Sequence, residues 1–130
     1  MKKQHYNETN IIFTYPNSWQ IEQDKNVISL YDPINGVGSI QFSIYYASNS
    51  QNISLKDELE DYVSDKHNKF VISVNDLYAC TNYLLDEDGV RYWKYWLFIK
   101  DNMLVFASYN CEKEDYGKEE KIVDEIMNAL

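Results

Sequence analysis

The sequence predicts an α+β fold in which a mostly antiparallel sheet of about six to eight strands packs with two helices. Several runs alternate apolar and polar residues with a period of two, which is typical of strands with one buried face. Short connections made of turn residues join many of these runs, and such connections favour antiparallel neighbours. Two other segments change to helical spacing. The predicted order is four strands, a helix, four strands and a helix.

A proline fixes the position of the first hairpin. Tyr15 and Pro16 close an apolar run, and Trp19 opens the next one. Proline has no N–H to donate and fixes φ near about −65°, so strand pairing stops there and the chain turns. Later turns are predicted at 24–26 and 32–38. The four strands predicted before the first helix are Ile11–Tyr15, Trp19–Gln23, Val27–Tyr31 and Ser39–Ala47.

Helical spacing begins after a polar segment at 48–52. Ser54 can cap a helix, and Asp57 follows three residues later in a weak capping box. The helix is predicted to end near 66–68. Its apolar stripe consists of Leu55, Leu59, Tyr62 and Val63.

Four more strands and a final helix are predicted in the second half of the chain. Tight connections at 86–89 and 101–102 indicate that the last three strands form a meander. The final helix is predicted over 116–130, with apolar residues at helical spacing. The four strands are Phe70–Val74, Tyr78–Leu85, Arg91–Lys100 and Met103–Asn110, and the apolar stripe is Ile122, Val123, Ile126, Met127 and Leu130.

The length and composition predict one folded domain. We expect residues 1–10, which are polar, to be a flexible lead-in, and residues 11–130 to be a single domain. The hydrophobic share of 45% argues against disorder. No apolar stretch follows the basic start at Lys2 and Lys3, and no run reaches transmembrane length. These features predict a cytoplasmic protein.

The charge limits the kind of partner. The net charge is −9 and the pI is about 4.6, so nucleic acid and anionic membranes are repelled. A protein with a basic surface is compatible with this charge. The oligomeric state is left open.

No residue pattern indicates catalysis or a phosphate cofactor. A hydrolase needs a nucleophile beside a base, but His5 and His67 are the only histidines and no Gly-x-Ser-x-Gly motif accompanies them. Gly36-Val37-Gly38 has no following Lys-Ser/Thr and precedes a strand, unlike a phosphate-binding loop. The sequence therefore predicts a protein that is not an enzyme and binds no cofactor.

No metal site is predicted either. The Asp86–Gly89 cluster lacks the alternating oxygens and distal glutamate of a calcium loop, and is interpreted as a charged hairpin tip. Cys80 and Cys111 are too few and too far apart for a zinc site. They are predicted to be free, partly buried thiols, with a single disulfide left as the alternative.

Five segments carry a likeness to a known superfamily through their order. They are Phe13-x-Tyr15-Pro16-x-x-Trp19, Gly38-Ser39-Ile40-x-Phe42-x-Ile44, a helix from Ser54-Leu55, the aromatic pair Tyr92–Ile99 and Leu104–Tyr109, and the terminal helix. In this order the chain resembles the PsbP-like superfamily, which includes PsbP, the Ran-binding Mog proteins and DcrB-like proteins. The resemblance implies a central antiparallel sheet with helices packed on it. It implies protein binding or support of other proteins, with no shared enzymatic chemistry.

The strongest candidate for a binding surface is the aromatic run from Arg91 to Phe98. With a period of two, one face carries Trp93, Tyr95 and Leu97, and the other carries Tyr92, Lys94, Trp96 and Phe98. If helices cover one face only, the other exposes residues typical of binding hot spots, and if they cover both, the run belongs to the core. The predicted protein-binding patch is Tyr92, Lys94, Trp96, Tyr45 and Tyr83.

Three functions remain open at this point. The first is a non-enzymatic protein-binding module, in its concrete form a bacterial immunity protein that neutralises a basic toxin, because acidic charge speeds capture of a basic partner. The second is an accessory or structural subunit of a larger assembly, as the PsbP-like resemblance implies. The third is a small-molecule binder or an enzyme with an unrecognised site, and it requires a deep pocket between sheet and helix.

Overall fold

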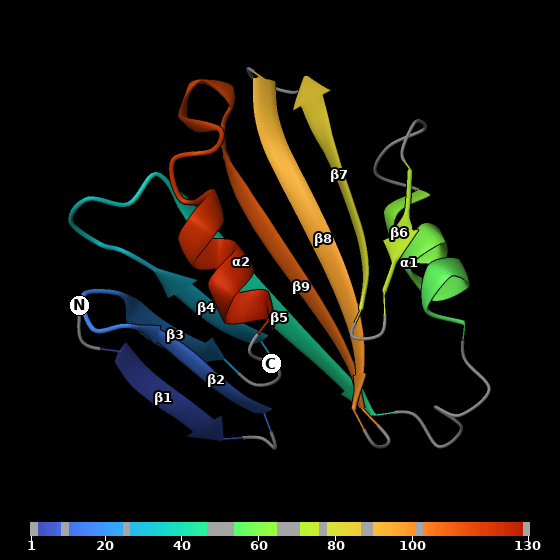
Figure 1. Ribbon diagram of the computed structural model, residues 1–130, viewed down its shortest axis with the longest axis horizontal. Helices are drawn as coiled ribbons and strands as arrows, with labels where there is room; N and C mark the ends of the chain where they lie inside the picture. The colour runs from blue at the N-terminus through green and yellow to red at the C-terminus, as the bar shows by residue number, and fades with distance from the viewer. Residues whose placement is uncertain are drawn as a thin grey trace.

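A computed structural model describes residues 3–8, 11–24, 27–46, 54–64, 71–75, 78–86, 90–100 and 103–128. In these ranges the chain forms a seven-stranded antiparallel sheet, a separate two-stranded sheet and two α-helices (Figure 1). The predicted α+β class, with two helices on a mostly antiparallel sheet, is confirmed. Neither of the described helices is long and apolar enough to cross a membrane.

The large sheet has the strand order β3-β4-β5-β9-β8-β7-β6, with antiparallel neighbours throughout. Strands β7, β8 and β9 form the predicted meander, and β5 pairs with β9 over its whole length. The strands are β3 (Gln20–Asp24), β4 (Val27–Tyr31), β5 (Gly38–Tyr46), β6 (Ser73–Val74), β7 (Ala79–Asp86), β8 (Val90–Lys100) and β9 (Met103–Glu112).

The segment predicted to be a flexible lead-in forms a strand over most of its length. Residues Lys3–Glu8 form β1, which pairs with β2 (Ile11–Pro16) in an antiparallel hairpin. Backbone pairing does not depend on apolar side chains, so a polar segment can form a strand beside an apolar one. The turn after β2 follows the prediction, because the Trp19 N–H donates to the carbonyl of Pro16 at 3.0 Å and the indole is buried.

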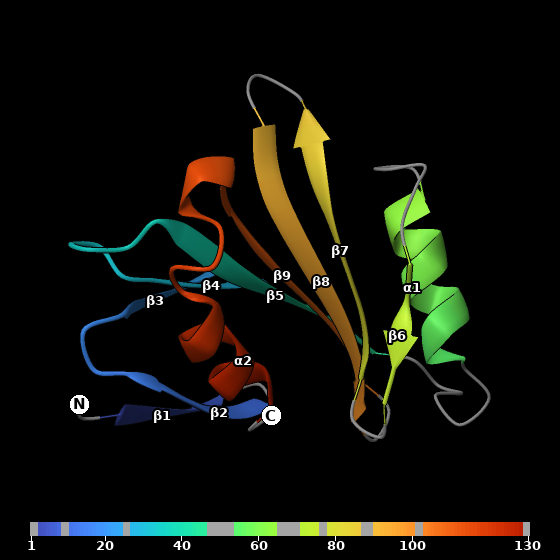
Figure 2. The ribbon, with the colours of Figure 1, turned by 45° about the horizontal axis from the view of Figure 1, so that its top comes forward.

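The two helices pack on opposite faces of the large sheet. Helix α1 (Leu55–Ser64) is capped by the Ser54 hydroxyl, which accepts from the Asp57 N–H at 3.3 Å. Helix α2 (Glu120–Asn128) is shorter than predicted and follows a 3₁₀ turn, η2 (Lys113–Asp115). Gly117, with φ of 88°, stands between them, and this left-handed backbone cannot continue a helix. Figure 2 shows α2 beside the β1–β2 hairpin, and α1 away from both.

Each face of the sheet has its own apolar core. On the α2 face, side chains of β2, β4, β5, β8 and β9 join Val123, Ile126 and Met127 of the helix, and the rings of Phe13 and Phe42 stack with centroids 5.0 Å apart. On the α1 face, a smaller core surrounds Leu59 and Val63. These helix residues lie on the stripes that helical spacing predicts. Both cysteines are free, and Cys111 is buried.

Candidate functional site

Strand β8 is covered by a helix on both faces. Trp96 is 1% exposed in the core beneath α2, and Tyr92 and Phe98 are buried with it. Tyr95 and Leu97 are buried in the core beneath α1. The sequence assigned these two sets of side chains to the correct faces. It left open whether the strand belongs to the core or to an exposed surface, and the structure supports the core. The prediction that Tyr92 and Trp96 belong to an exposed patch is therefore wrong.

Strand register also divides the predicted patch between the two faces. Residues directly opposite in neighbouring strands point to the same face. Tyr45 is opposite Leu104, which places it on the α1 face, and the backbone of Tyr83 is paired with Trp93. Tyr92, Lys94 and Trp96 point to the α2 face, so the five residues do not form one surface. The side chain of Tyr83 lies outside the described part of the chain.

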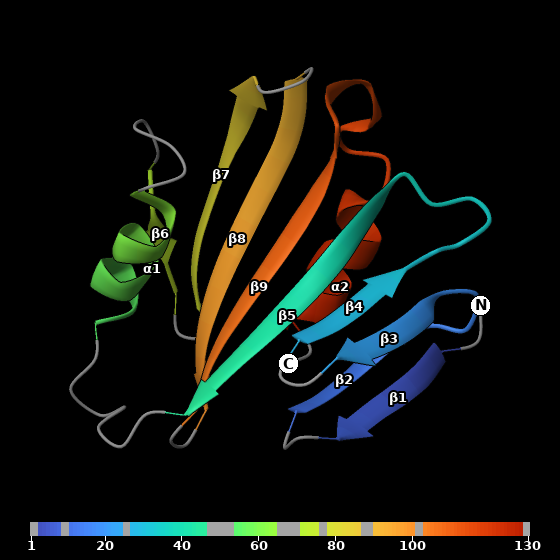
Figure 3. The ribbon, with the colours of Figure 1, turned by 180° about the vertical axis from the view of Figure 1, so that it is seen from behind.

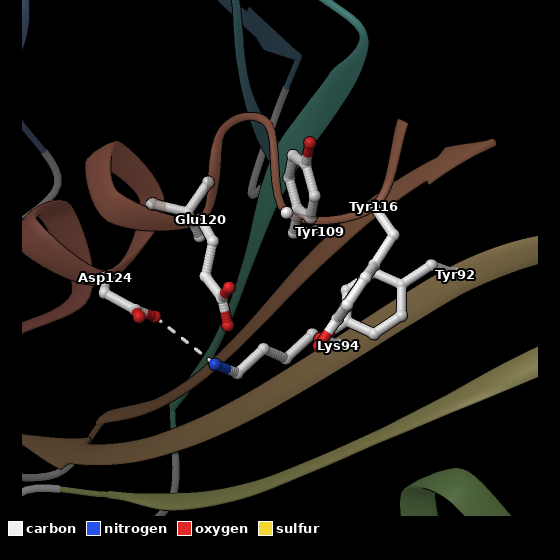
Figure 4. A pocket seen from close by; sticks show the side chains of 8 residues that line it. Tyr92, Lys94, Tyr109, Tyr116, Glu120 and Asp124 are labelled. Carbon is white, nitrogen blue, oxygen red and sulfur yellow. Dashed lines mark hydrogen bonds and ion pairs between the residues drawn. The ribbon is translucent and has the colours of Figure 1, made fainter. Parts of the chain in front are cut away.

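Tyr92 and Lys94 border a small pocket between β8, β9 and α2 (Figure 4). The Lys94 ammonium lies 3.3 Å from a carboxylate oxygen of Asp124, and the rings of Tyr92 and Tyr116 meet edge to face at 4.5 Å. The pocket has room for about one water molecule. It is too small for the small-molecule ligand that the third function requires. Its other lining residues are Tyr109, Gly117, Glu120 and Val123.

Lys94 joins α2 to the sheet. Besides pairing with Asp124, its ammonium lies 5.1 Å from the centroid of the Trp96 ring, within the range of a cation–π contact. Its side chain is 16% exposed. A lysine held in this way has a role in packing, and its charge is already satisfied within the chain.

Cys80 lies on the α2 face of the sheet, and burial raises the pKa of its thiol from 9.0 to about 11. Between these two values the unfolded chain loses the thiol proton while the folded chain keeps it, so stability falls as pH rises through this window and is retained below it. We expect the melting temperature to fall less steeply from pH 9 to pH 11 in Cys80→Ala than in the wild type. Parallel melting curves for the two proteins would contradict this assignment.

A buried glutamate, which sequence reasoning missed, joins three elements. Glu119 Oε1 accepts a hydrogen bond from the Gly38 N–H at 3.0 Å and another from the Tyr109 hydroxyl at 2.7 Å. It directly precedes α2, and its own carbonyl accepts from the Val123 N–H. Burial and the bond to Glu119 raise the pKa of Tyr109. These bonds fix the start of α2 against β5 and β9.

The α1 face carries a broad surface of the described sheet that no described helix covers. Figure 3 shows β9, β5, β4 and β3 from this side, with α1 displaced toward β7 and α2 behind the sheet. We call its outward-facing residues the open face. They alternate with the buried residues of the same strands, as expected when one side meets the core and the other does not. The open face consists of Gln20, Glu22, Asp24, Val27, Ser29, Tyr31, Ser39, Gln41, Ser43, Tyr45, Ser108 and Asn110.

Aromatic rings run from the α1 core to this open face. Trp93 stacks on Tyr95 with an interplanar angle of 6°, and Tyr62 of α1 contacts both Tyr95 and Phe106. Tyr45 meets Phe106 edge to face at 5.6 Å and is 51% exposed. The exposed ring of Tyr45 therefore contacts the buried ring of Phe106, which reduces the side-chain freedom that it loses on binding.

The charged groups of the open face, Glu22 and Asp24 of β3, are both acidic. The Tyr31 hydroxyl donates to Glu22 at 2.7 Å, and this bond raises the pKa of Tyr31. Arg91 donates to Asn110 at 2.6 Å on the same side of the sheet. Within the described ranges, no three His, Cys, Asp or Glu side chains come together to hold a metal ion.

Comparison with known proteins gives likenesses of structure only. No family model and no curated protein sequence matches the chain. Cyanobacterial PsbP from Synechocystis has a TM-score of 0.66 at 14% identity, over 98% of this chain and 90% of that one. The chain has the PsbP-like fold. The Ran-binding protein Mog1p of Saccharomyces cerevisiae has a TM-score of 0.68 at 8% identity, over 99% of this chain and 94% of that one.

A protein from Bacteroides thetaiotaomicron shares the PsbP-like fold within a longer chain. Its TM-score is 0.65 at 17% identity, and the match covers 91% of this chain but 43% of that protein. Identities this low carry the fold and leave function to be argued from the site. The resemblance predicted from the order of the sequence segments is confirmed at the level of the PsbP-like fold.

Proposed function

We propose that this chain is a non-enzymatic protein-binding module whose open face binds a basic protein. The observation that carries the proposal is the open face itself, a sheet surface on which no described helix packs and where Tyr45 is half exposed. Tyrosine combines a large apolar area with a hydroxyl and loses little entropy when it binds. Serine and glutamine around it supply adaptable hydrogen bonds.

The charge of the chain supports a basic partner. The net charge of −9 attracts a positively charged protein and speeds its association, and this attraction weakens as salt is added. Glu22 and its neighbour in β3, Asp24, place part of that charge at the edge of the open face. A partner with arginine or lysine opposite these groups fits both the charge and the surface.

The structural neighbours support protein binding as a use of this fold. Mog1p is described as a Ran-binding protein, so a domain with the PsbP-like fold binds a protein in that case. The concrete form of our proposal is an immunity protein that neutralises a basic toxin, a role that needs an acidic binding surface and no catalytic group.

The proposal is tested with two variants, each of which introduces an arginine on a different face of the sheet. Gln41 is exposed on the open face, whereas Gln23 is exposed on β3 and points to the opposite face with its partner Ile28. Each protein encoded beside the gene is co-expressed with the tagged chain, and binding is measured at several salt concentrations. We expect Gln41→Arg to weaken binding by about tenfold or more, because it places positive charge against a basic partner, and Gln23→Arg to change it little.

Three results would contradict the proposal. The first is an equal loss of binding in Gln41→Arg and Gln23→Arg. The second is an affinity that does not depend on the salt concentration, and the third is that none of the proteins encoded beside the gene binds the chain. For the immunity role, co-expression must also restore growth to cells that produce the toxin. If the protein that binds the chain is not toxic to cells, the immunity role is excluded.

The fold likeness to PsbP favours an accessory subunit as the second candidate. Such a subunit forms a stable complex of fixed stoichiometry, and neutralises nothing. Size-exclusion chromatography of the co-expressed proteins, combined with the growth assay, distinguishes this role from the immunity role.

A further inference from the structure

The loop that joins β4 to β5 presents an apolar side chain to solvent. Ile34, in the segment 32–37, is 85% exposed. The loop projects beyond the ends of both strands, on the side of the molecule away from α1 (Figures 1 and 3). Single exposed apolar residues are common on protein surfaces. Two features distinguish Ile34 from them, which are the fixed backbone of its loop and its place at one end of the open face.

Hydrogen bonds to Asp32 fix the backbone of this loop. The N–H groups of Ile34 and Asn35 both donate to Oδ1 of Asp32, at 3.0 and 3.1 Å. The N–H of Gly36 donates to the carbonyl of the same aspartate at 3.1 Å. A Cβ on Gly36 would collide with that carbonyl oxygen, so a side chain at this position would force the loop to shift. The loop is therefore ordered before it meets a partner, which lowers the entropy that a contact through Ile34 would cost.

The loop continues the open face at one end. It follows Tyr31 and comes shortly before Ser39, and both of these residues belong to the open face. The exposed side chain of Tyr45 lies at the other end of β5, and Ser39 and Tyr45 are about 20 Å apart at the usual rise of a strand. The open-face residues of β5 before Tyr45 are serine and glutamine. Exposed apolar groups therefore lie at both ends of a polar strip.

We propose that Ile34 is an anchor that enters an apolar pocket on the basic protein that the open face binds. The inference rests on the proposed function and adds a requirement for the same partner. The partner needs a pocket for one aliphatic side chain at the margin of its basic surface, about 20 Å or more from its contact with Tyr45. Burial of this side chain supplies affinity that salt does not screen, whereas the charges of Glu22 and Asp24 supply the part that salt weakens. The net charge of −9 opposes a second copy of this chain as the occupant.

The test uses the protein encoded beside the gene that binds the chain in the co-expression assay. Its dissociation constant is measured by calorimetry at low and high salt. We expect Ile34→Ala to weaken binding by about tenfold or more at both salt concentrations, and Ile34→Leu to bind within about threefold of the wild type. Asn35→Ala is the matched control, because Asn35 is exposed on the same loop and the substitution keeps its backbone bond to Asp32. It should bind within about twofold of the wild type.

Gly36→Ala tests the fixed backbone while Ile34 and every charge stay unchanged. The added Cβ moves the loop away from Asp32, so we expect binding to weaken by about threefold or more. Melting temperatures are measured for all variants. Ile34→Ala should melt with the wild type because the side chain is exposed, so a loss of binding in this variant does not reflect unfolding.

The results separate this anchor from the proposed function. If Ile34→Ala binds like the wild type while Gln41→Arg weakens binding, the anchor is wrong and the proposed function stands. If Ile34→Ala weakens binding while Gln41→Arg and Gln23→Arg have equal effects, the anchor is supported and the open face is contradicted. Equal losses in Ile34→Ala and Asn35→Ala, or a loss in Ile34→Ala that high salt removes, would overturn the anchor.

Two further results concern the occupant. A dimer in sedimentation velocity that Ile34→Ala dissociates would place Ile34 against a second copy of the chain and overturn the inference. If none of the proteins encoded beside the gene binds the chain, the inference and the proposed function are both contradicted.

Discussion

Replacing Trp96 with alanine is expected to lower the free energy of unfolding by about 3–5 kcal/mol, the usual cost of removing a large aromatic side chain from a core. The indole is 1% exposed beneath α2, and the Lys94 ammonium lies over its ring. The substitution therefore leaves a cavity in the main core and also removes a cation–π contact. Urea denaturation followed by circular dichroism measures this change.

Trp93→Ala is the matched control for this substitution. Trp93 is on the same strand, three residues earlier, and points to the opposite face, where it is half-buried and stacks on Tyr95. We expect it to cost about 1–2 kcal/mol, because less apolar surface returns to water. A Trp96→Ala protein as stable as the wild type would mean that Trp96 is exposed, which is the other alternative that the sequence left open, and equal costs for the two variants would contradict the difference in burial between the two faces.

This comparison shows what period-two patterning can and cannot predict. Alternation placed Trp93 and Trp96 on opposite faces of β8 correctly, because side-chain direction depends only on backbone geometry. Which face a helix covers depends on where α1 and α2 pack, and both helices present apolar stripes that fit either face. With aromatic residues on both sides of β8, the sequence left core and surface as two alternatives, and the burial of side chains on both faces supports core.

The composition of the candidate surface depended on strand register, which the sequence did not provide. Tyr45 was included in the predicted patch for its residue type, and it does lie on the open face. Its true neighbours on β5, Ser43 and Gln41, were not part of that patch. The pairing of β5 with β9 brings Ser108 next to them, across more than 60 residues of sequence.

Two other features could not be predicted from the pattern of residues in the sequence. Lys3–Glu8 carries no apolar alternation, so its pairing with β2 depends on backbone bonds that leave no trace in side-chain type. Glu119 is buried, and nothing in the sequence indicated this, since a single carboxylate carries no signal of burial. Its partners Gly38 and Tyr109 are 81 and 10 residues away, and only the assembled sheet brings them together.

Glu119→Ala is expected to lower the free energy of unfolding by about 2–4 kcal/mol. It removes the acceptor of the Gly38 N–H and of the buried Tyr109 hydroxyl, and each buried donor left unpaired costs about 1–3 kcal/mol. Glu119→Gln keeps a carbonyl oxygen for both donors and loses only the charge, so we expect it to cost about 1 kcal/mol. Amide exchange at Gly38 should accelerate in the alanine variant and stay slow in the glutamine variant. If the two variants are equally destabilised, the charge of Glu119 stabilises the start of α2 and its two hydrogen bonds do not.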